Sequence, residues 1–431
     1  MKYHIWTVGC QMNVADSRKL AAGLDRAGCT PAESPDDADL VVLNTCSVRE
    51  HAEDRAIGQL GRLKKLRSRG KDFRIAVMGC MVGVRDDDLR RRFPYVDVFA
   101  RPQDFAPIME VAGIEDTGGE FWPTTFGEPD APSAFVPVIH GCDKFCTYCI
   151  VPYRRGREKS RTVADIRNEV AHYCARGVRE VTLLGQTVEA YGHDLEPDAG
   201  GRTPDLGDLM RAIHDVPGLE RIRFLTSYPK DMTERIIDAV AELPKVCENF
   251  NIPVQAGDDA VLERMRRGYT LAEYLEKFAM VRARIPDAAM VTDVIVGFCG
   301  ETDEEFEHTC AILEQLRFDK VHVAAYSPRP GTIAHRTLAD DVPQDVKQAR
   351  LQRIERIEAR ISAEINAGLL DTVQEVLVES RREGRWSGRN RHGKLIHFEG
   401  NAAVGQLVSV HIDRTSAWSL QGTALPAPVP A

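Results

Sequence analysis

Six of the eleven cysteines fall into two groups of three. One group is contiguous and the other is dispersed through the first 80 residues: Cys142, Cys146, Cys149 and Cys10, Cys46, Cys80. A four-iron cluster normally takes four thiolates, one per iron. Three thiolates leave one iron open, and an open iron can bind a substrate or cofactor. Two such groups therefore indicate chemistry rather than storage of electrons.

Length and composition limit the classes of protein that are possible. The chain has 431 residues, 43% of them apolar, and a net charge of −9. This length suits roughly two to three domains. No apolar run approaches the about 20 residues of a membrane span, and no signal peptide is apparent, so we expect a cytoplasmic protein. In that compartment cysteines are more often metal ligands or catalytic groups than disulfide partners.

The dispersed cysteines each follow a short apolar run in the first domain. Residues 3–8, 40–43 and 73–78 read as buried parallel strands, with helices expected at 17–27, 48–67 and 86–92. Ligands of open α/β sheets bind at the carboxyl ends of the strands. Three strand ends of one sheet would bring Cys10, Cys46 and Cys80 together. The alternative is three buried structural thiols, since free Cys is among the most buried residue types.

The central segment predicts a partial barrel of strands and helices. A linker is expected over 113–133, because this stretch is rich in Gly, Pro, Thr and acidic residues. The strands that we expect beyond it are 135–139, 181–184, 222–226, 250–254, 291–296 and 321–325. Parallel strands of this kind place an active site at their carboxyl ends. The contiguous cysteines begin at this edge, shortly after the first strand, and one long helix is expected over 346–367.

The C-terminal segment predicts a small β-barrel. Its pattern changes to short alternating strands, expected at 373–378, 394–398 and 406–412. Arginines there alternate with Trp386, His397 and Phe398. Basic residues among aromatics favour RNA loops, through phosphate pairing and base stacking. The alternative is an ordinary solvated, charged surface.

The contiguous group resembles the cluster motif of the radical S-adenosylmethionine (SAM) superfamily. The spacing Cys142-x3-Cys146-x2-Cys149, with Tyr148 before the last cysteine, is specific. The resemblance implies that three thiolates hold a 4Fe-4S cluster whose open iron chelates SAM. It further implies reductive cleavage of SAM to a radical that removes a hydrogen atom from the substrate.

The dispersed group narrows the resemblance to the methylthiotransferase family. Residues 9–13, 44–50, 79–81 and 141–161 look like motifs of this family, and the C-terminal barrel looks like its RNA-binding TRAM module. The resemblance covers roughly residues 2–424. It implies an α/β fold with an open parallel α/β domain at 1–113, a partial TIM-like (βα)6 radical SAM barrel at 128–366 and a TRAM barrel at 367–425.

The residues around Cys10 and Cys46 look like one branch of this family. That branch inserts a methylthio group at C2 of isopentenyladenosine, next to the tRNA anticodon. The resemblance implies two 4Fe-4S clusters, and SAM as both methyl donor and radical source. The side chains and turns that would hold SAM are Gly185, Gln186, Ser227, Gln255, Gly297 and Glu301.

The implied partners are a tRNA anticodon stem-loop carrying isopentenyladenosine and an electron donor such as flavodoxin or ferredoxin. We expect a monomer that contacts no membrane. The basic residues expected to contact RNA are Arg154, Arg155, Arg157, Arg267, Arg389 and Lys394. For the run at 154–161 a solvated helix start is the competing interpretation.

Other functions remain open from sequence. The nearest is a sister branch that acts on threonylcarbamoyl-adenosine in tRNA or on an aspartate of a ribosomal protein. A non-catalytic RNA-binding protein with structural zinc is less consistent, because zinc takes four ligands per site. Thr187 and Cys299 depart from the family pattern, which commonly has Asn and Pro there.

Overall fold

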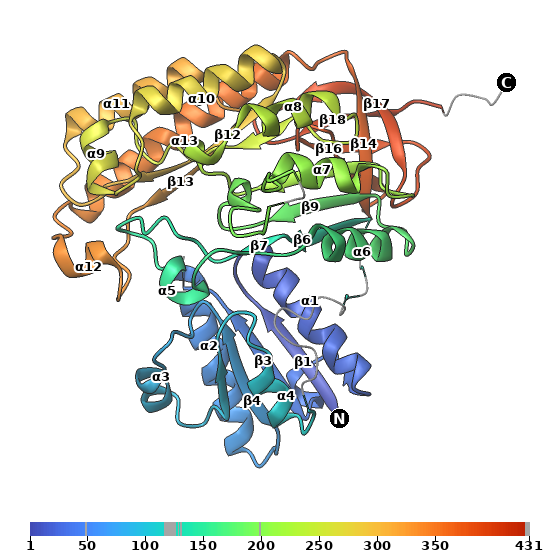
Figure 1. Ribbon diagram of the computed structural model, residues 1–431, viewed down its shortest axis with the longest axis vertical. Helices are drawn as coiled ribbons and strands as arrows, with labels where there is room; N and C mark the ends of the chain where they lie inside the picture. The colour runs from blue at the N-terminus through green and yellow to red at the C-terminus, as the bar shows by residue number, and fades with distance from the viewer. Residues whose placement is uncertain (48–49, 116–125, 128, 130–131, 198–199, 427–431) are drawn as a thin grey trace.

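The computed structural model describes residues 1–47, 50–115, 126–127, 129, 132–197 and 200–426. Three sheet systems follow one another along the chain, from the N-terminal α/β part through the central part to a C-terminal barrel (Figure 1). Residues 116–125, 128 and 130–131 of the expected linker lie outside the described residues. The α/β fold class predicted from sequence is confirmed.

The N-terminal sheet is fully parallel, with strand order β2-β1-β3-β4-β5. The strands are β1 (Lys2–Thr7), β2 (Thr30–Pro31), β3 (Leu40–Thr45), β4 (Arg74–Gly79) and β5 (Val98–Ala100). The helices are α1 (Gln11–Arg26), η1 (Pro35–Asp37), α2 (Glu50–Ser68), α3 (Asp87–Arg92) and α4 (Ala106–Val111). All six residues of β3 are buried, because separate apolar clusters cover the two faces of the sheet. Burial on both faces explains why the strands are continuous apolar runs.

Six parallel strands form the central sheet system, in two hydrogen-bonded groups, β10-β9-β6 and β11-β12-β13. A single bridge from Ile222 to Val246 links the two groups. The strands are β6 (Ser133–Pro137), β9 (Glu180–Leu184), β10 (Arg221–Leu225), β11 (Asn249–Asn251), β12 (Ala289–Val296) and β13 (Lys320–Ala325), with a small pair β7 (Ile139–His140) and β8 (Lys159–Ser160). The partial barrel thus has the six strands expected from sequence.

Helices cover the outside of the central strands (Figure 1). The helices of the central part are α5 (Val151–Arg155), which lies toward the N-terminal part, α6 (Val163–Cys174), η2 (Val188–Ala190), α7 (Leu206–His214), η3 (Pro229–Asp231), α8 (Glu234–Glu242), α9 (Asp259–Arg264), α10 (Leu271–Arg284), α11 (Asp303–Leu316), α12 (Ile333–Thr337) and α13 (Gln344–Ala367). Capping boxes begin α10 and α11, where Thr270 pairs with Glu273 and Thr302 with Glu305. Each box satisfies backbone N–H groups that the first helical turn leaves unpaired. The long helix expected at 346–367 is α13.

The C-terminal part is a closed five-stranded barrel in the order β14-β15-β16-β18-β17. Its strands are β14 (Val373–Arg382), β15 (Arg385–Arg389), β16 (Leu395–Glu399), β17 (Leu407–Thr415) and β18 (Leu420–Ala424). Sequence reasoning expected three of these strands and missed β15 and β18. Both are short and carry polar or small residues, so their apolar alternation is weak. The core of the barrel is formed by aliphatic residues together with Phe398.

Arginines attach the barrel to the central strands. The Arg221 side chain, which is fully buried, donates to the carbonyls of Arg389 (2.8 Å) and Glu375 (2.9 Å) and pairs with the Glu375 carboxylate (2.7 Å). From the barrel side, Arg391 pairs with Glu248 at 2.6 Å and Lys394 with Asp319 at 2.7 Å.

The contact of Lys394 with RNA that the sequence predicts stays a prediction, and the structure shows a second role for this residue. Its side chain is only 10% exposed and its ammonium is held by Asp319. Lys394 therefore serves the junction between the barrel and the central part.

None of the helices in the described ranges is long and apolar enough to cross a membrane.

The junction yields a first prediction. Replacing Arg221 with Ala leaves two partly buried carbonyl acceptors and the Glu375 carboxylate without their donor. We expect the barrel to lose roughly 2–4 kcal/mol of stability. Urea unfolding followed by tryptophan fluorescence measures this, because Trp386 and Trp418 lie in the barrel.

Arg382→Ala is the matched control, since Arg382 is an exposed arginine of the same barrel. It should change stability by no more than about 0.5 kcal/mol. Equal unfolding curves for the two variants would contradict the role given to Arg221.

Candidate functional site: two cysteine triads on adjoining sheet edges

The three dispersed cysteines lie at the carboxyl ends of three neighbouring parallel strands. Strand register aligns Thr7 of β1 with Asn44 of β3, and Thr45 of β3 with Gly79 of β4. Cys46 and Cys80 follow Thr45 and Gly79 directly, and Cys10 follows Thr7 after Val8 and Gly9. The structure therefore brings the three corners to one edge of the sheet.

Asparagine side chains hold these corners together. The Asn13 amide donates to the carbonyls of Val8 (3.0 Å) and Thr45 (2.9 Å). The Asn44 amide donates to the Asn13 carbonyl (2.8 Å). The Ser47 hydroxyl donates to the carbonyl of Cys80 (2.7 Å). Sequence reasoning did not assign roles to these side chains, because their partners are 5 to 33 residues away along the chain.

Glycines make the close approach possible. Gly79 has a φ of +96°, and a Cβ there would lie 2.3 Å from the Thr45 carbonyl oxygen. A Cβ on Gly9 would lie 2.7 Å from the Cβ of Cys46. Side chains at either position would push the cysteine corners apart.

The other two thiols of this triad affect the pKa of Cys80. The pKa of Cys80 is raised to about 11, because burial raises it most and Cys46 and Cys10 also raise it, while Arg155 lowers it. A cation bound here would offset this cost of ionisation, because a coordinated thiol is deprotonated outright. The arrangement fits an iron–sulfur cluster.

Arg155 joins the N-terminal and central parts of the chain. It ends α5, and its Nη2 donates to Asn13 (2.9 Å) and to Asp16 (3.0 Å) of α1. The side chains of Arg155 and Asp16 are 1% and 2% exposed. The sequence predicts that Arg155 contacts RNA, and this stays a prediction; in the structure its guanidinium is buried in this ion pair.

The contiguous cysteines lie on a loop that begins directly after β7. Gly141 starts it with a φ of +76°, and a Cβ there would lie 1.9 Å from the Arg157 carbonyl oxygen. Thr147 fixes the middle of the loop. Its N–H donates to the carbonyl of Met265 (2.9 Å) and its hydroxyl to the carbonyl of Arg264 (2.9 Å), and its own carbonyl accepts from the N–H of Ala334 (2.8 Å). The loop is therefore docked on the turn that follows α9.

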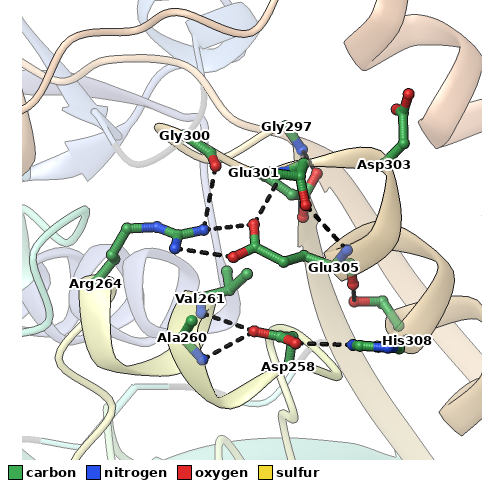
Figure 2. A network of polar contacts seen from close by, with 12 residues as sticks. Asp258, Ala260, Val261, Arg264, Gly297, Gly300, Glu301, Asp303, Glu305 and His308 are labelled. Carbon is green, nitrogen blue, oxygen red and sulfur yellow. Dashed lines mark hydrogen bonds and ion pairs between the residues drawn. The ribbon is translucent and has the colours of Figure 1, made fainter.

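A polar network positions that turn (Figure 2). Arg264 at the end of α9 forms two hydrogen bonds with Glu305 of α11, at 3.0 and 2.7 Å. Asp258 accepts from the N–H groups of Ala260 (2.8 Å) and Val261 (3.3 Å), and its other oxygen contacts His308 at 2.8 Å. Both ends of α9 are thereby tied to α11, which keeps residues 264–269 against the cysteine loop.

Arg267 of this turn lies inside the contiguous site. Its Nη1 is 3.3 Å from Cys146 Sγ and 3.2 Å from the Tyr148 hydroxyl, and its Nε donates to the Tyr269 hydroxyl at 3.0 Å. The residue is 6% exposed. The sequence predicts that Arg267 contacts RNA, and this stays a prediction; in the structure its guanidinium faces the cysteines.

Burial is also the largest cause of the raised pKa values of the contiguous thiols Cys142 and Cys149. It raises the pKa of Cys142 to about 11 and raises that of Cys149, and the neighbouring cysteines add to both shifts. Among the residues that the structure describes, no three His, Cys, Asp or Glu side chains surround the position of one metal ion. A four-iron cluster does not require such convergence, because each thiolate binds a different iron.

The residues expected to hold SAM cluster at the carboxyl ends of β9, β10 and β11. Half-buried Gln186 and buried Gln255 each have a buried side-chain oxygen with no hydrogen-bond partner among the described residues. Such oxygens are suited to the amino and hydroxyl donors of a polar ligand. Gly185 has no room for a side chain, since a Cβ would lie 2.6 Å from the Ile139 side chain. The backbone N–H of Ser227 donates to the carbonyl of Asn251.

Gly297 and Glu301 make contacts within the chain instead. Glu301 pairs with Arg350 at 2.7 Å and accepts from the Gly297 N–H at 2.6 Å. Gly297 has a φ of +67°, and a Cβ there would lie 2.3 Å from Lys347 of α13. The Glu301 carboxylate thus shapes the loop after β12 and has its charge already paired, which does not fit the predicted contact with SAM.

The remaining predicted basic residues are more accessible. Arg157 is 76% exposed and pairs with Asp143 at 2.8 Å. Arg389 is 47% exposed and lies 3.6 Å from Glu379. Arg154 is partly buried beside Gly83.

Thr187, one of the departures from the family pattern, supports the cysteine loop. Its hydroxyl donates to Glu158 at 3.0 Å, and Glu158 accepts from the N–H of Asp143 at 3.2 Å. The other departure, Cys299, is buried in the central core.

These backbone constraints yield a second prediction. Gly79→Ala should reduce iron binding at the dispersed triad, and Gly141→Ala at the contiguous triad, because each new Cβ meets a backbone carbonyl. Iron and sulfide per chain after anaerobic reconstitution should fall toward the content of one cluster in either variant.

Gly70→Ala is the matched control. Gly70 has a similar φ of +88° but no atom within 4 Å of an added Cβ. Its iron content should equal that of the unchanged protein. Full iron content in Gly79→Ala would contradict the position given to the dispersed site.

Three family profiles match the chain, one for each of its parts. The Radical SAM superfamily matches residues 136–313, Uncharacterized protein family UPF0004 matches residues 2–100, and the TRAM domain matches residues 371–425. The first two contain the contiguous and the dispersed cysteines, respectively, and the third covers the C-terminal barrel.

Solved structures share the fold. A radical S-adenosylmethionine methyltransferase, TsrM, from Kitasatospora setae with cobalamin and a 4Fe-4S cluster bound has a TM-score of 0.56 at 14% identity, covering 87% of this chain and 80% of that chain. The cobalamin-dependent S-adenosylmethionine radical enzyme OxsB has a TM-score of 0.52 at 11% identity, covering 83% of this chain and 56% of that chain.

Two curated relatives are similar over nearly the whole chain. Both are named tRNA-2-methylthio-N(6)-dimethylallyladenosine synthase. The protein from Dehalococcoides mccartyi (strain CBDB1) is 45% identical, covering 97% of each chain. The protein from Roseiflexus sp. (strain RS-1) is 46% identical, covering 98% of this chain and 89% of its own. With both cysteine triads in place, this chain belongs to the tRNA-2-methylthio-N(6)-dimethylallyladenosine synthase family of radical SAM proteins.

Proposed function

We propose that this protein is a tRNA methylthiotransferase that replaces the C2 hydrogen of N(6)-dimethylallyladenosine, also called isopentenyladenosine, with a methylthio group. The observation that carries the proposal is the pair of cysteine triads on adjoining sheet edges, with Arg155 of the segment after the contiguous cysteines held against the dispersed site. A protein that only transfers electrons does not need two three-cysteine sites beside an RNA-binding module. The names of the full-length relatives support the same reaction.

The residues fit two 4Fe-4S clusters and SAM. Cys10, Cys46 and Cys80 would hold one cluster, and Cys142, Cys146 and Cys149 the other. When bound, these groups supply the sulfur, methyl and one-electron chemistry that a C–H bond of adenine requires, since no side-chain base is strong enough to deprotonate it.

The protein's own residues position the two sites. Asn13 and Asn44 fix the dispersed corners, Thr147 fixes the contiguous loop, and the Arg155–Asp16 pair holds one site against the other. Gln186 and Gln255 offer unpaired oxygens to SAM. Four of the six cysteines, Cys46, Cys80, Cys142 and Cys146, are buried, which limits access of bulk water to the sites and protects reactive intermediates.

We infer that tRNA contacts the exposed arginines of the C-terminal barrel. Arg381, Arg382 and Arg385 are exposed at the β14–β15 hairpin, and the Arg381 guanidinium lies 4.9 Å from the Trp386 ring centroid. Together with Arg389 they offer both phosphate pairing and a stacking surface. Arg157, which is exposed next to the contiguous site, would contact the anticodon stem-loop near the target base.

The remaining partners follow from the reaction. Radical chemistry at the contiguous site needs one-electron reduction, so the electron donor is a protein of the flavodoxin or ferredoxin class. We propose that the enzyme acts as a monomer on an anticodon stem-loop that already carries the isopentenyl group.

An anaerobic turnover assay tests the function directly. Reconstituted protein, SAM and dithionite are mixed with an isopentenylated anticodon stem-loop, and its nucleosides are measured by mass spectrometry. We expect 2-methylthio-N(6)-dimethylallyladenosine. Formation of 5′-deoxyadenosine without a modified RNA would move the substrate to the threonylcarbamoyl-adenosine or ribosomal-protein branch.

Single cysteine variants separate the two sites. Cys46→Ala should still cleave SAM to 5′-deoxyadenosine but lose methylthiolation, whereas Cys149→Ala should lose both. Cys29→Ala is the control, because Cys29 is a core residue outside both triads. Full methylthiolation by Cys46→Ala would show that the dispersed triad is not a cluster site.

A further inference from the structure

Arg267 is a buried cation whose described partners include no carboxylate. Its polar contacts are Cys146 Sγ (3.3 Å), the Tyr148 hydroxyl (3.2 Å) and the Tyr269 hydroxyl (3.0 Å). Burying a charge without an opposite charge is costly, so buried cations are normally paired. The partner that balances Arg267 must therefore come from the cysteine site.

The other buried arginines show how unusual this is. Four arginines besides Arg267 are buried in the described part of the chain, and each has a carboxylate oxygen within 3.0 Å. These pairs are Arg155–Asp16, Arg161–Glu169, Arg221–Glu375 and Arg350–Glu301. Among these five arginines, Arg267 alone contacts a cysteine sulfur and no carboxylate oxygen.

Two aromatic rings fix the guanidinium in place. Its carbon lies 5.1 Å from the Tyr228 ring centroid and 5.2 Å from that of Tyr269. The Tyr269 hydroxyl donates toward the carbonyls of Pro253 (3.0 Å) and Val254 (3.1 Å), which turns its lone pairs to Arg267 Nε. Ring faces attract cations, so this cage holds the charge beside Cys146 without neutralising it.

We propose that Arg267 is the counter-ion of the cluster held by Cys142, Cys146 and Cys149, and that its charge and N–H···S hydrogen bond make this cluster easier to reduce. The inference rests on the proposed function, because it requires a cluster at this triad. Three thiolates bring negative charge to the site, and one further electron increases it. A fixed cation stabilises the reduced state more than the oxidised state, and hydrogen bonds to sulfur act in the same direction.

The step itself is the transfer of one electron. The electron comes from a one-electron donor, of the flavodoxin or ferredoxin class in the cell and dithionite in the test. No covalent bond of the protein forms or breaks, and no proton moves.

The dispersed triad also has arginines beside it, but they differ from Arg267. Arg155 acts on Cys80 and is already paired with Asp16 at 3.0 Å, and Arg154, which also acts on Cys80, is only partly buried. The buried arginine without a carboxylate partner in the described part of the chain lies at the contiguous site, where SAM would be cleaved.

A redox titration tests the proposal. Cys10, Cys46 and Cys80 are first replaced with Ala, so that only the contiguous site is loaded. Arg267→Gln, Arg267→Lys and Arg266→Gln are then compared in this protein by electron paramagnetic resonance of the reduced cluster. Arg266 is the matched control, because it is the neighbouring arginine but its side chain is exposed.

We expect Arg267→Gln to lower the ratio of reduced to oxidised cluster at a fixed potential by about tenfold, which is about 59 mV for a one-electron couple. Arg266→Gln should leave the ratio unchanged, and Arg267→Lys, which keeps the charge, should fall between. If Arg267→Gln folds but loads no iron while Arg267→Lys loads it, the need for a cation is also upheld.

Two results would overturn the proposal. The first is an unchanged ratio in Arg267→Gln, or a change equal to that in Arg266→Gln. The second is a folded Arg267→Lys that binds no iron, because charge would then not be what the site requires. Failure of the proposed function looks different: the protein with an intact Arg267 would itself load no cluster or cleave no SAM.

Discussion

The buried ion pair between Arg155 and Asp16 is the constraint on which the geometry of both sites depends. It crosses from α5 of the central part to α1 of the N-terminal part, and both side chains are almost fully excluded from water. Removing one partner of such a pair costs about 3–5 kcal/mol, because a charge is left buried alone. Arg155 also lies next to Cys80 and contacts Asn13, so the pair sets the position of the dispersed triad relative to the contiguous loop.

Cationic side chains serve three different tasks in this protein. Arg221, Arg391 and Lys394 attach the C-terminal barrel to the central strands, and Arg155 and Arg267 serve the cysteine sites. The arginines of the β14–β15 hairpin remain exposed. An acidic protein with a net charge of −9 can therefore still offer a local basic surface to RNA, while its buried cations are used internally.

Rigid support of the cysteines is a shared feature of the two sites. Both triads begin at strand ends, both have glycines with positive φ where a Cβ would meet a carbonyl, and both are held by hydrogen bonds from distant residues. The Arg264–Glu305 pair in Figure 2 extends this support to α11. Ligands fixed in this way keep their spacing when the metal is absent, which reduces the cost of assembling the site.

The sequence by itself determined the six cysteines as candidate ligands, the α/β order of the strands and the presence of a C-terminal barrel, because spacing and hydrophobic periodicity are local properties. It could not assign the roles of Arg155, Arg267, Lys394 and Glu301, or find Asn13 and Asp16 as partners. Arg155 and Asp16 are 139 residues apart, and Arg267 and Cys146 are 121 apart. A charged residue looks the same in sequence whether it meets RNA or a buried partner, and only the packing of distant segments decides which of these it meets.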